Sequence, residues 1–225
     1  MKIWHISDTH TYHEMLTVPE NIDIVVHSGD CSNSRELIPS IKECLEFIDW
    51  YAELPIVNKV LIAGNHDIAF ERNLICKDKC KEKGITYLEN NDVIVEGFKI
   101  WGSPLTPSFG EGWAFNRKRD KLHDLWASIP EDTDIVVSHG PAKGVLDLSY
   151  DRSGNLERCG CAALKKRVLN LEPKLFLFGH IHDCKDLGNA GYTKLATHKT
   201  IFSNGSVVTD GKFGQINHNG NIFEI

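Results

Sequence analysis

Five short apolar runs recur along the chain, and each is followed at once by a polar segment that carries Asp, His or Asn. Short aliphatic and β-branched runs of this kind are typical of buried strands. In an open α/β sheet the loops at the carboxyl ends of the strands meet in one crevice, so polar segments far apart in sequence would converge there. The runs cover residues 3–6, 22–26, 60–63, 135–137 and 175–178.

Each polar segment contributes side chains that can bind a metal ion. Imidazole, carboxylate and amide oxygen form a donor set that suits one or two ions of Mn²⁺, Fe²⁺ or Zn²⁺ better than Ca²⁺. Two pairs of these residues stand two positions apart, so each pair projects to one side of an extended segment. The candidate ligands are Asp8, His10, Asp30, Asn65, His139, His180 and His182.

Between the apolar runs, the spacing of hydrophobic residues predicts helices. The clearest covers residues 34–51, where Leu37, Ile41 and Leu45 recur near helical spacing and Ser34 is the expected N-cap. Because strands and helices alternate without a repeat or a linker, we expect one α/β domain over residues 1–225. Further helices are expected over 71–83, 119–128 and 161–171, short strands over 86–88, 93–96 and 99–101, and hairpins over 200–225.

Composition narrows the class of protein. The chain has 225 residues and a formal net charge of -6, which argues against a dedicated binder of duplex nucleic acid because such proteins present a basic face. No apolar run is long enough to span a bilayer, and the N-terminal residues lead directly into the first predicted strand, so we expect no export signal. Seven cysteines in such a chain predict reduced thiols and a cytoplasmic protein.

In their order, the polar segments resemble the motifs of the calcineurin-like metallophosphoesterases, which are D-x-H, G-D, G-N-H-[DE], a lone H and G-H-x-H. One such motif is weak evidence, whereas all of them in order over nearly the whole chain are specific. The matching residues are Asp8-Thr9-His10, Gly29-Asp30, Gly64-Asn65-His66-Asp67, His139 and Gly179-His180-Ile181-His182. The stretches Gly102-Ser103-Pro104, Trp113-Ala114-Phe115-Asn116 and Gly160-Cys161 are also similar to the small MPPED-type branch, which is cyclic-nucleotide phosphodiesterase-like.

The resemblance implies a four-layer αββα sandwich, with two mixed β-sheets inside and helices on both outer faces. It also implies two divalent metal ions, Mn²⁺ foremost and Fe²⁺ or Zn²⁺ as alternatives, with Asp30 shared between them. One ion would take Asp8, His10 and His182, and the other Asn65, His139 and His180.

The same resemblance implies a mechanism. A hydroxide that bridges the two ions would attack phosphorus in line. His66 directly follows a metal-binding Asn and is the candidate general acid for the leaving alkoxide, and Asp67 would hold the imidazole of His66 in the required tautomer. The expected reaction is hydrolysis of a phosphodiester bond in a small substrate, with nucleotides as the substrate class.

A glycine-rich segment over residues 108–117 carries several aromatic side chains. Aromatic rings on such a loop can stack on a base, so Phe109 and Trp113 are candidate substrate contacts. The same rings could equally serve packing alone. Outside the motifs, His27 is close enough to Asp30 in sequence to support the site, and Asn204 is expected to form a turn.

Other functions share parts of this pattern. Protein phosphatases carry an Asp and an Arg-Gly beyond the G-D motif, where this chain has Cys31-Ser32-Asn33-Ser34-Arg35. A nuclease of the DNA-repair type usually adds a DNA-capping domain, for which 225 residues leave no room. A non-enzymatic scaffold on the same fold normally loses metal ligands, and here the set is complete.

The choice between a phosphodiesterase and a phosphomonoesterase depends on whether arginine side chains lie near the metal motifs. A monoester carries about two negative charges at neutral pH, and sites built for it usually add arginines that clamp the extra oxygen. Near the motifs the sequence offers only Arg35 and Arg72, both in expected helix starts. We therefore expect a preference for phosphodiesters over phosphomonoesters.

Overall fold

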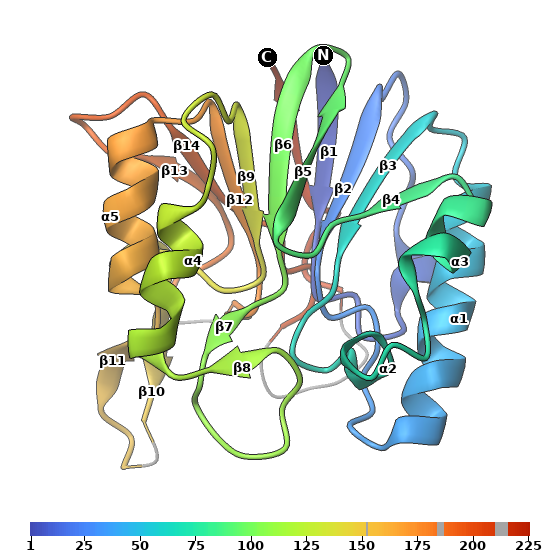
Figure 1. Ribbon diagram of the computed structural model, residues 1–225, viewed down its shortest axis with the longest axis horizontal. Coiled ribbons are helices and arrows are strands. Elements are labelled where there is room, and N and C mark those ends of the chain that lie inside the picture. The colour runs from blue at the N-terminus through green and yellow to red at the C-terminus, as the bar shows by residue number, and fades with distance from the viewer. Residues whose placement is uncertain (152, 184–186, 210–215) are drawn as a thin grey trace.

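Two mixed β-sheets form the centre of the molecule, and the computed structural model describes residues 1–151, 153–183, 187–209 and 216–225 (Figure 1). The first sheet has the order β15-β1-β2-β3-β4, formed by β1 (Lys2–Ile6), β2 (Ile24–Ser28), β3 (Asn58–Ile62), β4 (Ile85–Tyr87) and β15 (Asn221–Glu224). The second has the order β13-β14-β12-β9-β6-β5, formed by β5 (Asn91–Val95), β6 (Phe98–Ser103), β9 (Ile135–Ser138), β12 (Leu175–Phe178), β13 (Gly191–Lys194) and β14 (Ile201–Asn204).

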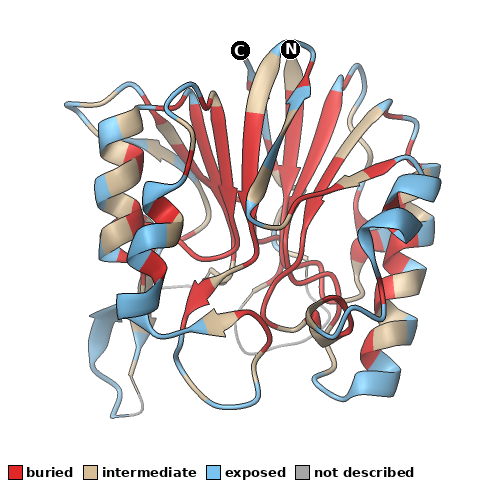
Figure 2. Cartoon of the chain, viewed as in Figure 1, coloured by how far each residue is buried: buried red, intermediate tan, exposed pale blue. Residues whose placement is uncertain are grey.

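Helices cover the outer face of each sheet. The helices α1 (Leu37–Glu53), α2 (Ile68–Glu71) and α3 (Lys77–Glu82) lie on the side of the first sheet, and α4 (His123–Ala127) and α5 (Ala162–Leu171) lie on the second (Figure 1). Burial is concentrated in the strands, while the helices expose their outer faces (Figure 2). The predicted four-layer sandwich with two mixed sheets is confirmed.

The alternation of side chains along the strands builds three apolar layers. Ile3 joins the cluster between the two sheets, whereas its neighbour Trp4 joins the cluster beneath α1. Likewise Val137 points between the sheets and Val136 toward α4 and α5. Successive side chains of a strand point to opposite faces, so strands covered on both sides must be apolar at every position. This is why the predicted strands appear in the sequence as unbroken apolar runs.

The first helix begins later than predicted, and Ser34 is not its N-cap. The cap is Glu36, whose side chain makes no capping bond, and Ser34 Oγ instead accepts the backbone N–H of Glu36 at 3.1 Å. The carboxylate of Glu43 accepts the backbone N–H groups of Asn33 and Ser34 at 2.7 and 2.8 Å. These bonds satisfy the N–H groups of the segment before the helix.

Two other predicted elements differ from the structure. The expected helix over 71–83 is divided into α2 and α3, because Asn73 adopts a left-handed φ of 55° between them. The expected hairpins over 200–225 are confirmed only in part: Val208 and Ile216 form an antiparallel bridge, whereas the strands on either side of it pair elsewhere. The strand β14 pairs in parallel with β12 and antiparallel with β13, and β15 pairs with β1 in the other sheet; residues 210–215 lie outside the described residues.

The remaining predictions shift only at their ends, and the expected helix over 119–128 starts with a 3₁₀ turn, Arg119–Leu122. The six described cysteines are free thiols, as expected, and Cys184 lies outside the described residues. No helix in the described part of the chain is long and apolar enough to cross a membrane.

Candidate metal centre

Loops after β1, β2, β3, β9 and β12 bring the predicted ligands together at one edge of the two sheets. The strands β1, β2 and β3 run parallel to one another, as do β9 and β12, so their carboxyl ends share an edge within each sheet. Ligand atoms of Asp8, His10 and His182 lie within 4.8 Å of one another, and those of Asp30, His139 and His180 form a second such group.

In the first group, two imidazole nitrogens face the same point. His10 Nε2 lies 3.1 Å from His182 Nε2, and His182 Nε2 lies 3.3 Å from Asp8 Oδ1. His10 Nδ1 donates to the backbone carbonyl of Ser32 at 3.0 Å, so the lone pair of a neutral His10 is on Nε2. Converging lone pairs and a buried carboxylate fit a divalent cation, which would bind all three side chains at once.

In the second group, as in the first, a histidine is oriented by a backbone carbonyl and its Nε2 faces the other ligands. His139 Nδ1 donates to the backbone carbonyl of Ser28 at 2.9 Å. Its Nε2 lies 2.8 Å from Asn65 Oδ1 and 3.3 Å from Asp30 Oδ2. Asp30 Oδ2 is also 3.9 Å from His10 Nε2 in the first group. Asp30 is therefore the carboxylate that lies between the two groups, in the place predicted for a shared ligand.

Burial and charge set the protonation of these side chains in the metal-free protein. Burial alone would raise the pKa of Asp8 and of Asp30, but the neighbouring histidines, chiefly His182 and His139 respectively, hold both below their ordinary range. Burial lowers the pKa of His180 to about 3, so it is neutral. Burial also opposes charge on His139, yet the carboxylates of Asp30 and Asp8 raise its pKa to about 9. The ionised carboxylates of Asp30 and Asp8 thus favour the positively charged form of His139.

Four of the candidate ligands have strained backbone conformations. The φ angles of Asp8, His10, Asp30 and His180 are 51°, 41°, 57° and 69°, in the left-handed region that non-glycine residues rarely adopt. Such residues cluster at functional sites, where the surrounding structure holds them in place.

Two glycines allow the loops to approach closely. A Cβ atom at Gly64 would overlap the carboxylate of Asp30. A Cβ at Gly179 would overlap Ser7 Oγ and Asp8 Oδ2. Glycine is thus required at both positions by contact with a predicted ligand rather than by a turn.

The prediction that Asp67 orients the imidazole of His66 is wrong. The buried carboxylate of Asp67 accepts backbone N–H groups of Asp30 at 2.9 Å, Ser32 at 2.9 Å and Gly64 at 2.7 Å, together with the Ser32 hydroxyl at 2.8 Å. These donors use its oxygens, so Asp67 holds the loop that carries Asp30.

The imidazole of His66 is oriented instead by a backbone carbonyl. His66 Nδ1 lies 2.7 Å from the oxygen of Asn33, and the backbone N–H of His66 donates to Asp30 Oδ1 at 2.7 Å. The ring contacts those of His10 and Trp113, with centroid distances of 4.6 and 4.9 Å. His66 therefore lies beside the first group of ligands, with Nε2 as the nitrogen left for other contacts.

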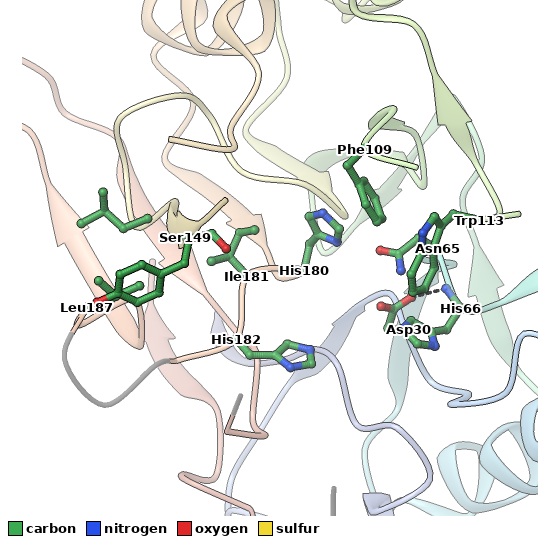
Figure 3. Close-up of a pocket in the computed structure, with 12 residues that line it drawn as sticks. Asp30, Asn65, His66, Phe109, Trp113, Ser149, His180, Ile181, His182 and Leu187 are labelled. Carbon is green, nitrogen blue, oxygen red and sulfur yellow. Dashed lines mark hydrogen bonds between the residues drawn. The ribbon is translucent and has the colours of Figure 1, made fainter. Parts of the chain in front are cut away.

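A cavity of about 280 Å³ opens onto the centre, and both predicted aromatic contacts line it. Phe109 packs on His180 with a centroid distance of 4.9 Å. Figure 3 shows His66 and Trp113 on one side of His180, and Ser149 on the other. Sequence reasoning did not find the residues on that second side, because Ser149 belongs to no recognisable motif.

Arg35 lies closer to the site than its sequence position indicates. Its guanidinium carbon is 4.5 Å from the ring centroid of Trp113, on the segment before α1 rather than within the helix. An arginine is therefore in contact with a side chain that lines the cavity.

Buried polar side chains outside the motifs hold the loops. Asn204 ends β14 and forms the expected turn, because its Oδ1 accepts the N–H of Ser206 at 3.0 Å. Its buried amide also donates to the carbonyls of Ile181 at 2.7 Å and Asn189 at 3.0 Å. Ile181 stands between two predicted ligands, so Asn204 fixes their loop.

His27 supports the loops that carry the other predicted ligands, as expected. Its Nε2 lies 3.1 Å from Thr9 Oγ1, and its Nδ1 accepts the N–H of Gly29.

Known proteins are similar to this chain in sequence and in fold. The family profile described as calcineurin-like phosphoesterase matches residues 1–184. Metallophosphoesterase domain-containing protein 1 of Homo sapiens is 34% identical over 228 residues, which cover 91% of this chain and 65% of the relative, and its counterpart in Mus musculus gives the same values. The chain thus spans slightly less than two thirds of the length of these relatives.

A solved structure that is 16% identical has a TM-score of 0.66 and covers 90% of this chain and 89% of its own, which shows a shared fold. The family match covers most of the chain, including the loops that bring the predicted ligands together. The chain belongs to the calcineurin-like phosphoesterase family of metal-dependent phosphoester hydrolases.

Proposed function

We propose that the protein hydrolyses the phosphodiester bond of a small substrate, with nucleotides as the substrate class. The observation that carries the proposal is the cavity of about 280 Å³, in which Asp30, Asn65 and His66 share one space with aromatic side chains. Such a cavity places an ester bond beside the predicted metal ligands and a base or sugar against the rings.

The proposed cofactors are two divalent metal ions, with Mn²⁺ favoured by the mixture of imidazole and oxygen donors. Asp8, His10 and His182 would hold one ion, Asn65, His139 and His180 the other, and Asp30 both. When bound, such a pair lowers the pKa of a coordinated water and draws negative charge from phosphoryl oxygens.

His66 is the proposed general acid. Hydrolysis forms a P–O bond to the oxygen of water and breaks the P–O bond to the leaving alkoxide, which must take up a proton. The carbonyl of Asn33 accepts the Nδ1 proton of His66 whether the ring is neutral or charged. Nε2 is therefore the nitrogen that gives its proton to the leaving oxygen.

A second candidate function is a phosphomonoesterase, and Arg35 is the observation that favours it. The guanidinium beside Trp113 could reach the additional charged oxygen that a monoester presents. This side chain is exposed, however, and it is not among the described residues that line the cavity.

Steady-state kinetics with added Mn²⁺ tests the two functions. We expect higher kcat/KM for bis(p-nitrophenyl) phosphate than for p-nitrophenyl phosphate, and a diester activity that Arg35→Ala changes less than threefold. Higher values for the monoester, lost in Arg35→Ala, would overturn the proposal in favour of a phosphomonoesterase. Arg72→Ala, a change at an exposed arginine beyond α2, is the matched control.

A further inference from the structure

A second cavity, of about 600 Å³, adjoins the cavity of the metal centre. The two share five lining residues, Phe109, Ser149, Tyr150, His180 and Ile181. Drug-sized ligands are held by cavities of about 300–1,000 Å³, so the second cavity has room for a nucleoside-sized group, whereas the first is at the lower limit. The space open to a substrate therefore continues past Phe109 and His180.

A short hairpin forms one wall of both cavities. It consists of β10 (Leu148–Tyr150) and β11 (Leu156–Arg158). Two buried side chains anchor it: Asn189 exchanges hydrogen bonds with the backbone of Leu148 at 3.1 and 2.8 Å, and Asp147 accepts the N–H of Gly160 at 3.1 Å. Asn189 is itself bound by Asn204, which also holds the loop of the predicted ligands. The hairpin is thus connected to the metal centre by hydrogen bonds.

The chemistry of the second cavity suits an uncharged, partly aromatic group. Phe109 and Tyr150 are half-exposed rings that line both cavities, and exposed aromatic rings of this kind can stack on a base. Among the described lining residues, Arg119 is the cation, and Asp151 and Glu157 are the acids. Among these described residues the carboxylates outnumber the cation, which disfavours a second phosphate group beside them.

The position of His66 decides which part of a substrate can enter this cavity. A general acid must lie within hydrogen-bond reach of the leaving oxygen. His66 and Trp113 line the metal cavity, and neither is among the described residues that line the second one. The leaving group therefore lies toward His66, and the group that stays esterified to phosphorus extends the opposite way, past Phe109.

We infer that the substrate is an acyclic phosphodiester whose retained ester group is a nucleoside, bound in the second cavity between Phe109 and Tyr150. This inference rests on the proposed phosphodiesterase function. In a cyclic phosphodiester one sugar supplies both ester oxygens, so the retained and leaving groups cannot separate into two cavities. An acyclic diester places one group on each side of His180.

Two substrates with the same leaving group test the inference. Hydrolysis of thymidine 5′-(p-nitrophenyl phosphate) releases nitrophenolate and thymidine 5′-monophosphate, and methyl p-nitrophenyl phosphate releases nitrophenolate and methyl phosphate. Because stacking on one aromatic side chain is worth roughly 5- to 150-fold, we expect kcat/KM for the thymidine ester to exceed that for the methyl ester by about this factor. Tyr150→Ala should lower the ratio because it leaves Phe109 as the one remaining ring of the pair, whereas Tyr150→Phe should keep the ratio.

Leu156→Ala is the matched control, because Leu156 pairs with Tyr150 in the hairpin and is exposed without lining either cavity in the described structure. The ratio should not change in this variant. A wild-type ratio near one, or a ratio that survives in Tyr150→Ala, would overturn the inference while leaving the phosphodiesterase function intact.

A binding measurement separates this result from failure of the proposed function. Calorimetric titration of the protein with thymidine 5′-methyl phosphate, in the presence of a chelator, measures the second cavity without hydrolysis. Binding that Tyr150→Ala weakens and Tyr150→Phe retains would support the cavity assignment even if neither ester were hydrolysed. Equal affinity in wild type and Tyr150→Ala would contradict it.

Discussion

Replacing Asp67 should destabilise the protein itself, in addition to its effect on catalysis. The carboxylate accepts the backbone N–H groups of Asp30, Ser32 and Gly64 in a buried place, so Asp67→Ala leaves three donors without a partner. Each unpaired buried donor costs about 1–3 kcal/mol. Burial and the charge of Asp30 raise the pKa of Asp67, so losing this carboxylate also relieves a repulsion. We expect a net loss of about 3–5 kcal/mol in the free energy of unfolding.

Urea denaturation of metal-free protein measures this loss without a contribution from bound ions. A decrease of this size is a large part of the roughly 5–15 kcal/mol that stabilises a typical domain, so the midpoint should fall markedly. Asp124→Asn is the control, because the side chain of Asp124 is fully exposed and its change should cost less than about 0.5 kcal/mol. If Asp67→Ala unfolds within about 1 kcal/mol of wild type and only kcat falls, the assignment of Asp67 to loop support is refuted.

Three further changes test the metal centre and its chemistry. Asp30→Ala removes the carboxylate between the two ligand groups, so elemental analysis should show that both ions are lost together; full occupancy with normal activity would contradict this. His66→Ala should lower kcat by roughly 10²–10⁴-fold for poor leaving groups and much less for nitrophenolate, and an equal loss for both would rule out the acid role. Gly179→Ala places a methyl group against Ser7 and Asp8, so metal content should fall; a variant with wild-type metal content would show that the loop can move aside.

Many of the candidate ligands can be predicted from the sequence because the patterns that mark them lie within short segments of the chain. A strand covered on both faces must be apolar throughout, and the polar residue that ends it marks the edge of the sheet. From these two rules the sequence predicts the strands that precede Asp8, Asp30 and His139. In the structure, parallel pairing of the strands brings these residues to the same edge. The resemblance of the motifs supplied the grouping of ligands, and the structure places them in the same two groups.

The roles of single side chains could not be predicted as well from the sequence, because these roles depend on hydrogen-bond partners that are distant in the chain. The donors to Asp67 include residues 35 and 37 positions away, and nothing in the local sequence distinguishes a carboxylate that holds a loop from one that orients an imidazole. Asn204 shows the same limit, since its sequence indicates the turn that its Oδ1 forms with Ser206 but not the bond from its amide to a carbonyl 23 positions away.

By itself, then, the sequence determined most of the strands, the candidate ligands and the family, because periodicity and motif spacing are properties of short segments. Only the tertiary structure decided that Asn33 rather than Asp67 orients His66, and that Tyr150 and His180 line a common second cavity. Those contacts depend on how separate loops are placed above the sheets, and that placement is set by the packing of the whole sandwich.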